Sequence, residues 1–243
     1  MIVGKSLFML TAADEVVDDE VELLSATVEL SGMRVAELVC GNGRFARQLL
    51  ARASVGSIIA FEVDATQHHL NLTAASTPSL EFRFGGAEAI SLESGSVDGV
   101  VMMRSLHHVP VPLLDRALVE IHRVLVPGGW LYVSEPIYAG DLNDIIKLFH
   151  DERIVREKAR AALQAAAAEG LLEEVSEKEF LTPVVFRGYD DFVAKVVRAT
   201  HTAHVYRDDV AAEVRSRFDR VTTLGGARFL QPTRVNLLRR PAV

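Results

Sequence analysis

The sequence predicts an α/β fold in which helices cover both faces of a mostly parallel sheet. Short apolar runs of four to seven residues, rich in β-branched and aromatic side chains, recur along the chain between turn-forming residues. Between these runs, apolar residues recur at helical spacing. A regular alternation of nearly continuous apolar strands with helices is typical of a parallel sheet that is buried on both faces.

The expected elements follow one another in a regular order. A first helix is expected within residues 13–30, where valine and leucine recur at helical spacing among acids. Five strands are then expected, at residues 34–39, 57–63, 80–84, 97–103 and 129–136. Helices are expected between them, at residues 44–53, 65–74 and 112–125. Strands connected through helices in this way are expected to run parallel.

The composition restricts the class of protein. The chain has 243 residues, of which 49% are hydrophobic, and this suffices for one domain with a large core. The net charge of −7, without a stretch dense in lysine and arginine, argues against nucleic-acid binding. Cys40 is the single cysteine, which excludes an internal disulfide and a cysteine-rich metal site. No apolar run approaches the roughly 20 residues that span a bilayer, and no convincing signal peptide is present, so a soluble cytoplasmic protein is expected.

The turn after the first expected strand has the features of a nucleoside-binding loop. Gly41 and Gly43 follow the strand and precede a helix, so the backbone can turn tightly and approach a ligand. The N-terminus of that helix directs unpaired N–H groups toward the same crevice. About 20 residues later, Glu62 and Asp64 close the second strand, as the pattern requires. A carboxylate there can accept hydrogen bonds from both hydroxyls of a ribose.

Two cofactors fit this loop. The stretch GNGRFA, residues 41–46, matches the G-x-G-x-x-A pattern that binds NAD. Glu37 lies just before the turn, where a carboxylate would repel the pyrophosphate of NAD. S-adenosylmethionine (SAM) carries an ammonium and a sulfonium and has no phosphate, so the charge of Glu37 favours SAM.

Motifs within residues 30–136 resemble, in order, those of the class I SAM-dependent methyltransferases. VAELVCGNGRFA, residues 35–46, resembles motif I, and FEVDATQHHL, residues 61–70, resembles the acidic end of the second strand. LEFRFGGAEAISLESGSVDGVVMMRSLHHVP, residues 80–110, resembles the third and fourth strands of the small-molecule branch, methyltransferase type 11. ALVEIHRVLVPGGWLYVSEP, residues 117–136, resembles the following helix, Pro-Gly-Gly turn and fifth strand. The resemblance implies a Rossmann-like, seven-stranded, mostly parallel sheet with an antiparallel last strand.

The resemblance also implies where SAM binds. The first loop would surround the methionine moiety and the sulfonium, and an acid at the end of the second strand would bind the ribose. Glu62 is preferred for the ribose because it stands at the C-terminal edge of that strand, and Asp64 is the alternative. Residues 86–88 would lie beside the adenine, and the end of the fourth strand beneath the methionine portion. The residues so implied to bind the cofactor are Glu37, Cys40, Gly41, Gly43, Glu62, Asp64, Gly86, Ala87, Glu88, Arg104 and Ser105.

Two positions depart from the pattern of the family. Val39 stands where the family commonly has glycine, which makes the entry to the loop less permissive. Gly86 stands where the family commonly has an aspartate that bonds the adenine amino group, and this leaves the contact to the backbone, to water or to Glu88. The departures motivate one alternative, a SAM-binding sensor or scaffold that does not methylate. The second alternative is an NAD-dependent oxidoreductase, and Glu37 and the lack of a hydride-transfer motif argue against this hypothesis.

Methyl transfer from a sulfonium is an in-line displacement, and it needs a base only when the acceptor must lose a proton. Alignment of the reactants can supply roughly 7–11 kcal/mol. A neutral histidine suits the base near pH 7, and the catalytic candidates are His107, His108 and His150. A metal site formed by His150, His201 and His204 with Asp151 or Glu152 is considered, but the spacing does not bring these residues together, so no metal is expected.

One methyltransferase domain is expected over residues 1–243, with its SAM-binding core at residues 30–136. The sixth strand is expected within residues 171–186 and the antiparallel seventh within residues 227–240. Two further segments are candidate elements of a cap that would close over the substrate and exclude water: residues 137–158 and a helical insertion at residues 188–227. The expected acceptor is a small molecule, the expected coproduct is S-adenosylhomocysteine, and neither nucleic acid nor membrane is an expected partner. A homodimer is left open.

Overall fold

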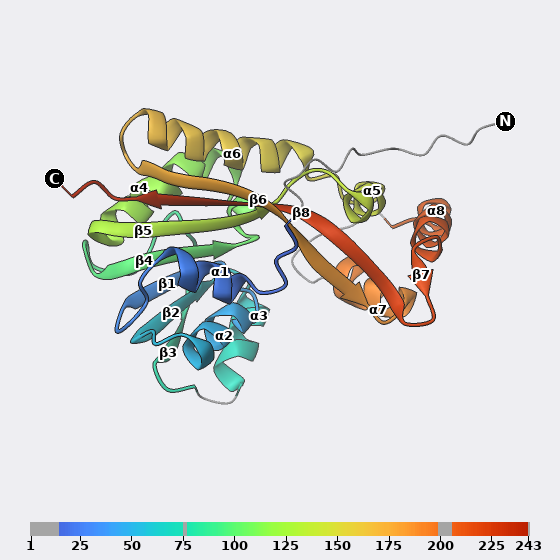
Figure 1. The fold of residues 1–243 in the computed structure, drawn as a ribbon, viewed down its shortest axis with the longest axis horizontal. Helices are drawn as coiled ribbons and strands as arrows, with labels where there is room; N and C mark the ends of the chain where they lie inside the picture. Colours follow the sequence, from blue (N-terminus) through green and yellow to red (C-terminus); the bar gives the residue numbers. More distant parts are fainter. Residues whose placement is uncertain (1–14, 75–76, 199–205, 243) are drawn as a thin grey trace.

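A computed structural model describes residues 15–74, 77–198 and 206–242 of the chain. Its strands lie in the order β3-β2-β1-β4-β5-β8-β6 across one sheet (Figure 1). These strands are β1 (Arg34–Leu38), β2 (Ser57–Glu62), β3 (Leu80–Phe84), β4 (Val97–Met103), β5 (Leu125–Pro136), β6 (Glu173–Phe186) and β8 (Gly226–Arg239). A two-residue strand, β7 (Thr222–Thr223), pairs with β8 beside this path.

The directions of the strands confirm the predicted fold class. β1 pairs in parallel with β2 and β4, and parallel pairing continues outward to β3 and β5. β8 lies between β5 and β6 and is antiparallel to both. The chain therefore changes its direction of winding between β1 and β4, and such a switch point leaves a crevice at the carboxyl ends of the two strands.

Helices cover both faces of the sheet. The principal ones are α1 (Glu20–Thr27), α2 (Arg44–Arg52), α3 (Ala65–Thr73), α4 (Leu114–Val124) and α6 (Arg153–Ala168). Val100 and Val101 are neighbours in β4, yet Val100 packs in one apolar cluster with residues of α4 and α6, and Val101 in another with residues of α1 and α2. Alternate side chains of a strand point to opposite faces, so each face has its own core. Among the described residues, every helix is too short or too polar to cross a membrane.

The first helix is shorter than the sequence predicts. The expectation was a helix within residues 13–30, but α1 begins at Glu20 because the carboxylate of Asp19 accepts hydrogen bonds from the N–H groups of Val21 and Glu22. The chain just before Asp19 is extended, and there the N–H of Val17 donates to the carbonyl of Leu181 in β6. Pairing with a distant strand therefore competes with the helical pattern. Residues 13 and 14 lie outside the described residues.

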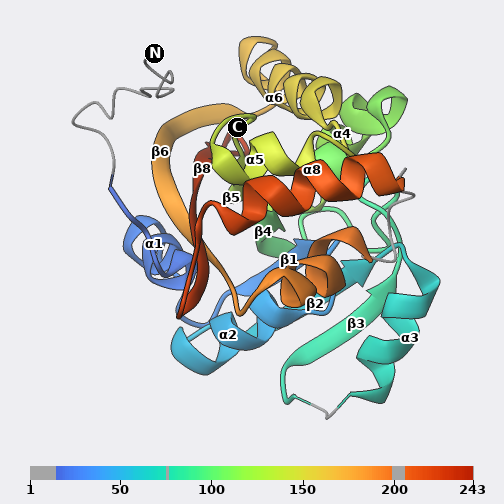
Figure 2. The same cartoon turned by 90° about the vertical axis from the view of Figure 1, so that its right-hand side faces the viewer.

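A separate apolar cluster lies beyond the parallel strands, where the long strands β6 and β8 extend outward (Figure 1). It joins their outer ends to α5 (Asp141–Ile146), α7 (Tyr189–Phe192), the π-helical turn Val193–Val197 and α8 (Asp208–Asp219). We call this assembly the cap. Figure 2, which views the molecule from this side, shows α5, α7 and α8 in front of the sheet. The cap's buried phenylalanines are Phe149, Phe186, Phe192, Phe218 and Phe229.

Candidate functional site

Two buried carboxylates hold the loop that follows β1. The N–H of Gly41 donates to Oε2 of Glu62 at 2.6 Å. From the other side, Oε2 of Glu37 accepts from the N–H of Ala46 in the first turn of α2, at 3.1 Å. Gly43 begins that helix with a φ of 66°, and a Cβ there would lie 2.6 Å from the ring of Phe82. The loop therefore requires glycine at position 43 for both its backbone conformation and its packing.

Burial changes the acidity of the groups around this loop. Burial and, to a smaller extent, the charge of Glu62 together raise the pKa of Glu37 to about 8, although the hydrogen bond from Ala46 acts to lower it. Burial, together with the charges of Glu37 and Glu62, also raises the pKa of the Cys40 thiol. A cation placed beside Glu37 would favour its ionised form, so the site is electrostatically suited to a positively charged ligand.

Glu62 and Asp64 have different partners. Besides Gly41, Glu62 accepts the N–H groups of Val63 and Asp64 at Oε1, each at 2.8 Å. The carboxylate of Asp64 accepts from the first turn of α3, and so caps that helix. Glu62 is buried and Asp64 is half-buried. Glu62 therefore holds the loop after β1 through a direct hydrogen bond, whereas Asp64 caps the start of α3.

Two neighbouring cavities meet at the carboxyl ends of β1 and β4. The loop cavity, about 660 Å³ in volume, is lined among others by Gly41, Glu62, Asp64, His108 and Arg198. The β6 cavity, about 770 Å³, is lined among others by Glu37, Phe45, Thr182, Val184 and Phe186. Residues that line both cavities are Cys40, Asn42, Met103, Arg104 and Lys195. Glu37, Glu62 and Asp64 thus line two adjoining cavities, which together form one crevice, and Lys195 of the cap lines both.

The segment proposed to lie beside the adenine is at residues 86–88, which line neither cavity. Ala87 is buried. The carboxylate of Glu88 folds back over Gly86, and a Cβ built on Gly86 would lie 2.3 Å from Oε2 of Glu88. Glu88 thus brings a carboxylate to the position where the family commonly has an aspartate.

The end of β4 is connected to α1 by an ion pair that the sequence did not indicate. The guanidinium of Arg104 pairs with Glu20, whose other carboxylate oxygen accepts from the hydroxyl of Ser134 at 2.5 Å. Arg104 has a φ of 54°, in the left-handed region. Ser105 is buried, and its hydroxyl donates to the carbonyl of Leu38 at the end of β1. Glu20 was missed because it is one of many acids in its segment and only the packed fold shows its partner.

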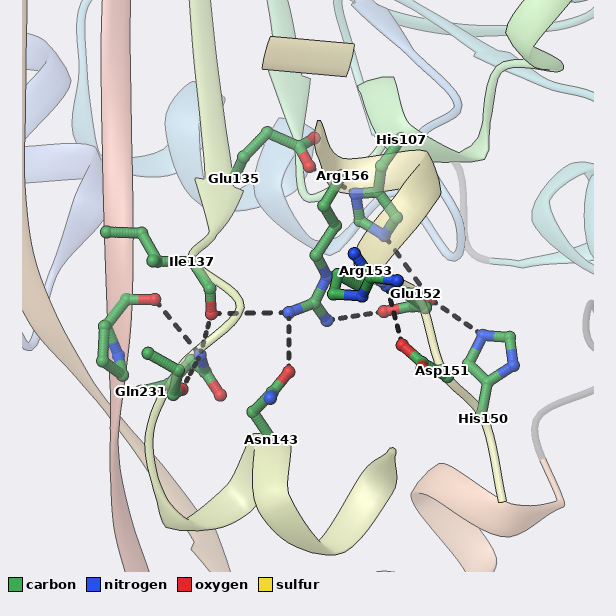
Figure 3. Close-up of polar contacts among 12 residues, drawn as sticks. His107, Glu135, Ile137, Asn143, His150, Asp151, Glu152, Arg153, Arg156 and Gln231 are labelled. Carbon is green, nitrogen blue, oxygen red and sulfur yellow. Dashed lines mark hydrogen bonds and ion pairs between the residues drawn. The ribbon is translucent and has the colours of Figure 1, made fainter. Parts of the chain in front are cut away.

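His107 and His108 lie in a short 3₁₀ turn after β4, Leu106–His108. His107 is buried between two acids: its Nδ1 contacts Oε2 of Glu135, and its Nε2 lies 3.7 Å from Oε1 of Glu152 (Figure 3). His108 is exposed and lines the loop cavity. Of the three histidines with a predicted catalytic role, His108 lines one of the two cavities described above, and His107 and His150 line neither.

Glu152 joins His107 to His150. Nε2 of His150 lies 2.9 Å from the same Oε1 of Glu152, and the guanidinium of Arg156 pairs with Oε2 at 2.5 Å (Figure 3). Burial raises the pKa of Glu152, but the charges of His107, Arg156 and His150 and the hydrogen bond from Arg156 lower it to about 2. The carboxylate is therefore ionised. His201 and His204, which were considered together with His150, lie outside the described residues.

Comparison with known proteins places this geometry in a family. Residues 36–133 match the family described as a methyltransferase domain. Phthiotriol/phenolphthiotriol dimycocerosates methyltransferase 1 of Mycobacterium ulcerans is 33% identical over 129 residues, which cover 52% of this chain and 47% of that protein. The chain thus spans about half the length of the curated relatives it matches.

Solved structures share the fold over almost the whole chain. The YcgJ protein of Bacillus subtilis gives a TM-score of 0.63 at 15% identity, covering 91% of this chain and 97% of that chain. The [4+2]-cyclase SpnF gives a TM-score of 0.60 at 20% identity, covering 93% of this chain and 81% of that chain. At these identities the likeness shows the fold alone. Residues 36–133 thus match a methyltransferase domain, and the sheet order and the ordered motifs support the predicted class I SAM-dependent methyltransferase.

Proposed function

We propose that the protein transfers a methyl group from SAM to a small-molecule acceptor by in-line displacement. The observation that carries this proposal is the pair of buried carboxylates, Glu37 and Glu62, on the two sides of the Gly41–Gly43 turn. Both residues line the crevice at the switch point of the sheet, where open α/β sheets bind ligands. A cationic nucleoside without phosphate suits such a site better than a dinucleotide does.

Each part of SAM has a proposed partner in this chain. Glu37 would face the ammonium and the sulfonium, and Glu62 would bind the ribose hydroxyls. Glu88 would accept a hydrogen bond from the adenine amino group, in place of the aspartate that the family commonly has. The leaving sulfur is neutral after transfer, so the protein has mainly to align acceptor and sulfonium and to exclude water.

The acceptor would enter between the cap and the ends of β4 and β5. Val184, Phe186 and Val196 line the β6 cavity, and their apolar surface supports an acceptor with an apolar part. The curated relative named above is, by its name, a methyltransferase of phthiotriol and phenolphthiotriol dimycocerosates. The net charge of −7 supports a small molecule rather than a nucleic acid.

A second candidate function is SAM binding without methyl transfer. Two observations favour it: Val39 has a φ of 53° at a position where the family commonly has glycine, and the fold also serves a protein named as a cyclase. In this case the crevice would bind SAM, but no acceptor would be methylated.

Two measurements test the proposal. Calorimetric titration with SAM, S-adenosylhomocysteine and NAD should show binding of the first two and not of NAD. Incubation with methyl-labelled SAM and a pool of small metabolites should then transfer the label to an acceptor. Binding without transfer would favour the second candidate, and tighter binding of NAD than of SAM would contradict both.

A further inference from the structure

We propose that His107, His108 and Glu152 bind a divalent metal ion at the acceptor side of the crevice. One ring nitrogen of each histidine and one carboxylate oxygen of Glu152 all lie within 4.8 Å of one another. The histidines follow β4 and the acid precedes α6, so the cluster exists only in the folded chain. Imidazole nitrogen and carboxylate oxygen are the donors that zinc and related first-row ions bind.

The orientation of His107 supports this proposal. Its Nδ1 contacts Glu135, which is itself fixed by the N–H of Leu106 at 2.8 Å. A metal-binding histidine commonly donates its second ring N–H to a carboxylate in this way, and the bond aims the other nitrogen at the ion. In this orientation Nε2 of His107 faces Oε1 of Glu152. A metal ion bound between these two atoms would hold both side chains in this arrangement.

The distances agree with a shared ion. Nε2 of His107 and Oε1 of Glu152 are 3.7 Å apart, too far for a hydrogen bond. Two ligands of one tetrahedral zinc ion are roughly 3.4 Å apart, given bonds of about 2.1 Å. Oε2 of Glu152 pairs with Arg156, and Oε1, which also contacts Nε2 of His150 at 2.9 Å, is the oxygen that would bind the ion.

The consequence for catalysis depends on the proposed methyl transfer. His108 lines the loop cavity, which shares Met103 and Lys195 with the β6 cavity proposed for the acceptor, so the ion would lie in the cavity that adjoins the acceptor. Three protein ligands leave a coordination position open, and an acceptor hydroxyl bound there would lose its proton more readily. Its oxygen would then attack the methyl carbon: the O–C bond forms, the C–S bond breaks, S-adenosylhomocysteine leaves as a neutral thioether, and the hydroxyl proton passes to solvent. The acceptor class would be hydroxyl compounds.

The test measures metal binding directly, without SAM. The full chain without a polyhistidine tag is freed of metal with a chelator, then titrated with Zn²⁺ by calorimetry and with Co²⁺ by visible absorption. We expect one ion per chain. His108→Gln and Glu152→Gln should each weaken binding at least tenfold, and Glu135→Gln about tenfold through the orientation of His107. His69→Gln, at an exposed histidine of α3, is the matched control and should leave binding unchanged.

The absence of stoichiometric binding, or binding that survives both His108→Gln and Glu152→Gln, would overturn the proposal. Because His108 is exposed, its substitution decides the question even if the Glu152 variant does not fold. SAM affinity is measured on the same samples. SAM binding and methyl transfer without metal binding would overturn the metal site alone, whereas metal binding without SAM binding would contradict the proposed function.

Discussion

The loop that follows β1 and the cap are held in place by different interactions. At the loop, the buried carboxylates of Glu62 and Glu37 accept hydrogen bonds from the N–H groups of Gly41 and of Ala46 in the first turn of α2. In the cap, aromatic rings pack edge to face: the ring centroid of Phe186 lies 5.4 Å from that of Phe192 and 5.9 Å from that of Phe229. The family match covers residues 36–133 and none of the cap. We infer that cofactor binding and acceptor binding can be altered separately.

The largest effect on stability is expected from removing a buried ring of the cap, and this substitution tests whether the cap and the loop after β1 act separately. Phe218 is fully buried in the cap, and Phe218→Ala should lower the free energy of unfolding by about 3–5 kcal/mol. Because this ring is remote from the loop after β1, SAM binding measured by calorimetry should persist while methyl transfer is lost. Phe84→Ala, at an exposed phenylalanine of β3, is the control and should change SAM binding and methyl transfer little. Equal loss of SAM binding and transfer would show that the two regions are not independent.

The next largest effect is expected on SAM affinity, from substitution of one of the two acids, Glu62 and Asp64, at the end of β2. Glu62→Ala should weaken SAM binding by about 1–3 kcal/mol, the usual cost of losing charge-assisted hydrogen bonds. Asp64→Ala should instead lower stability by about 1 kcal/mol through the lost cap of α3, with little change in SAM affinity. Calorimetry and denaturant unfolding of both variants check this, and the reverse pattern would assign the ribose to Asp64.

Glu37 should make stability depend on pH. Its pKa is raised in the folded protein to about 8 from a usual value of 4.5, so the folded chain binds more protons than the unfolded chain between these values. The contribution to stability is complete below pH 4.5 and is lost as pH rises toward 8. Between pH 6 and pH 8 the loss should be about 2 kcal/mol. Denaturant unfolding of Glu37→Gln should lack this decline, and a variant with the wild-type pH profile would exclude Glu37 as its source.

The smallest expected effect is on stability, from substitutions of Val39 at the start of the loop after β1. Val39 has a φ of 53°, and a side chain in this left-handed conformation is strained. Val39→Gly relieves this strain and Val39→Ala does not, while both remove the packing of the valine side chain. The glycine variant should therefore be more stable than the alanine variant by about 1 kcal/mol, measured by denaturant unfolding. Equal stability of the two variants would show that the loop is not strained at this position.

The sequence by itself determined the parallel half of the fold and the residues at its strand ends. The strands at residues 80–84 and 97–103 have the predicted bounds, because apolar runs between turn formers are a local signal. Glu37 and Glu62 could be proposed as partners of one ligand because parallel strands bring their carboxyl ends to the same edge of a sheet. Neither inference requires knowledge of contacts between distant segments.

Only the tertiary structure decided which side chains meet across the crevice. Arg104 pairs with Glu20, 84 residues away, and His107 contacts Glu135, 28 residues away. Residues 15–17 pair with β6 although their apolar spacing favours a helix. The partner of a buried polar group is fixed by strand order and by the packing of elements on the sheet. That information is not contained in any local stretch of the chain.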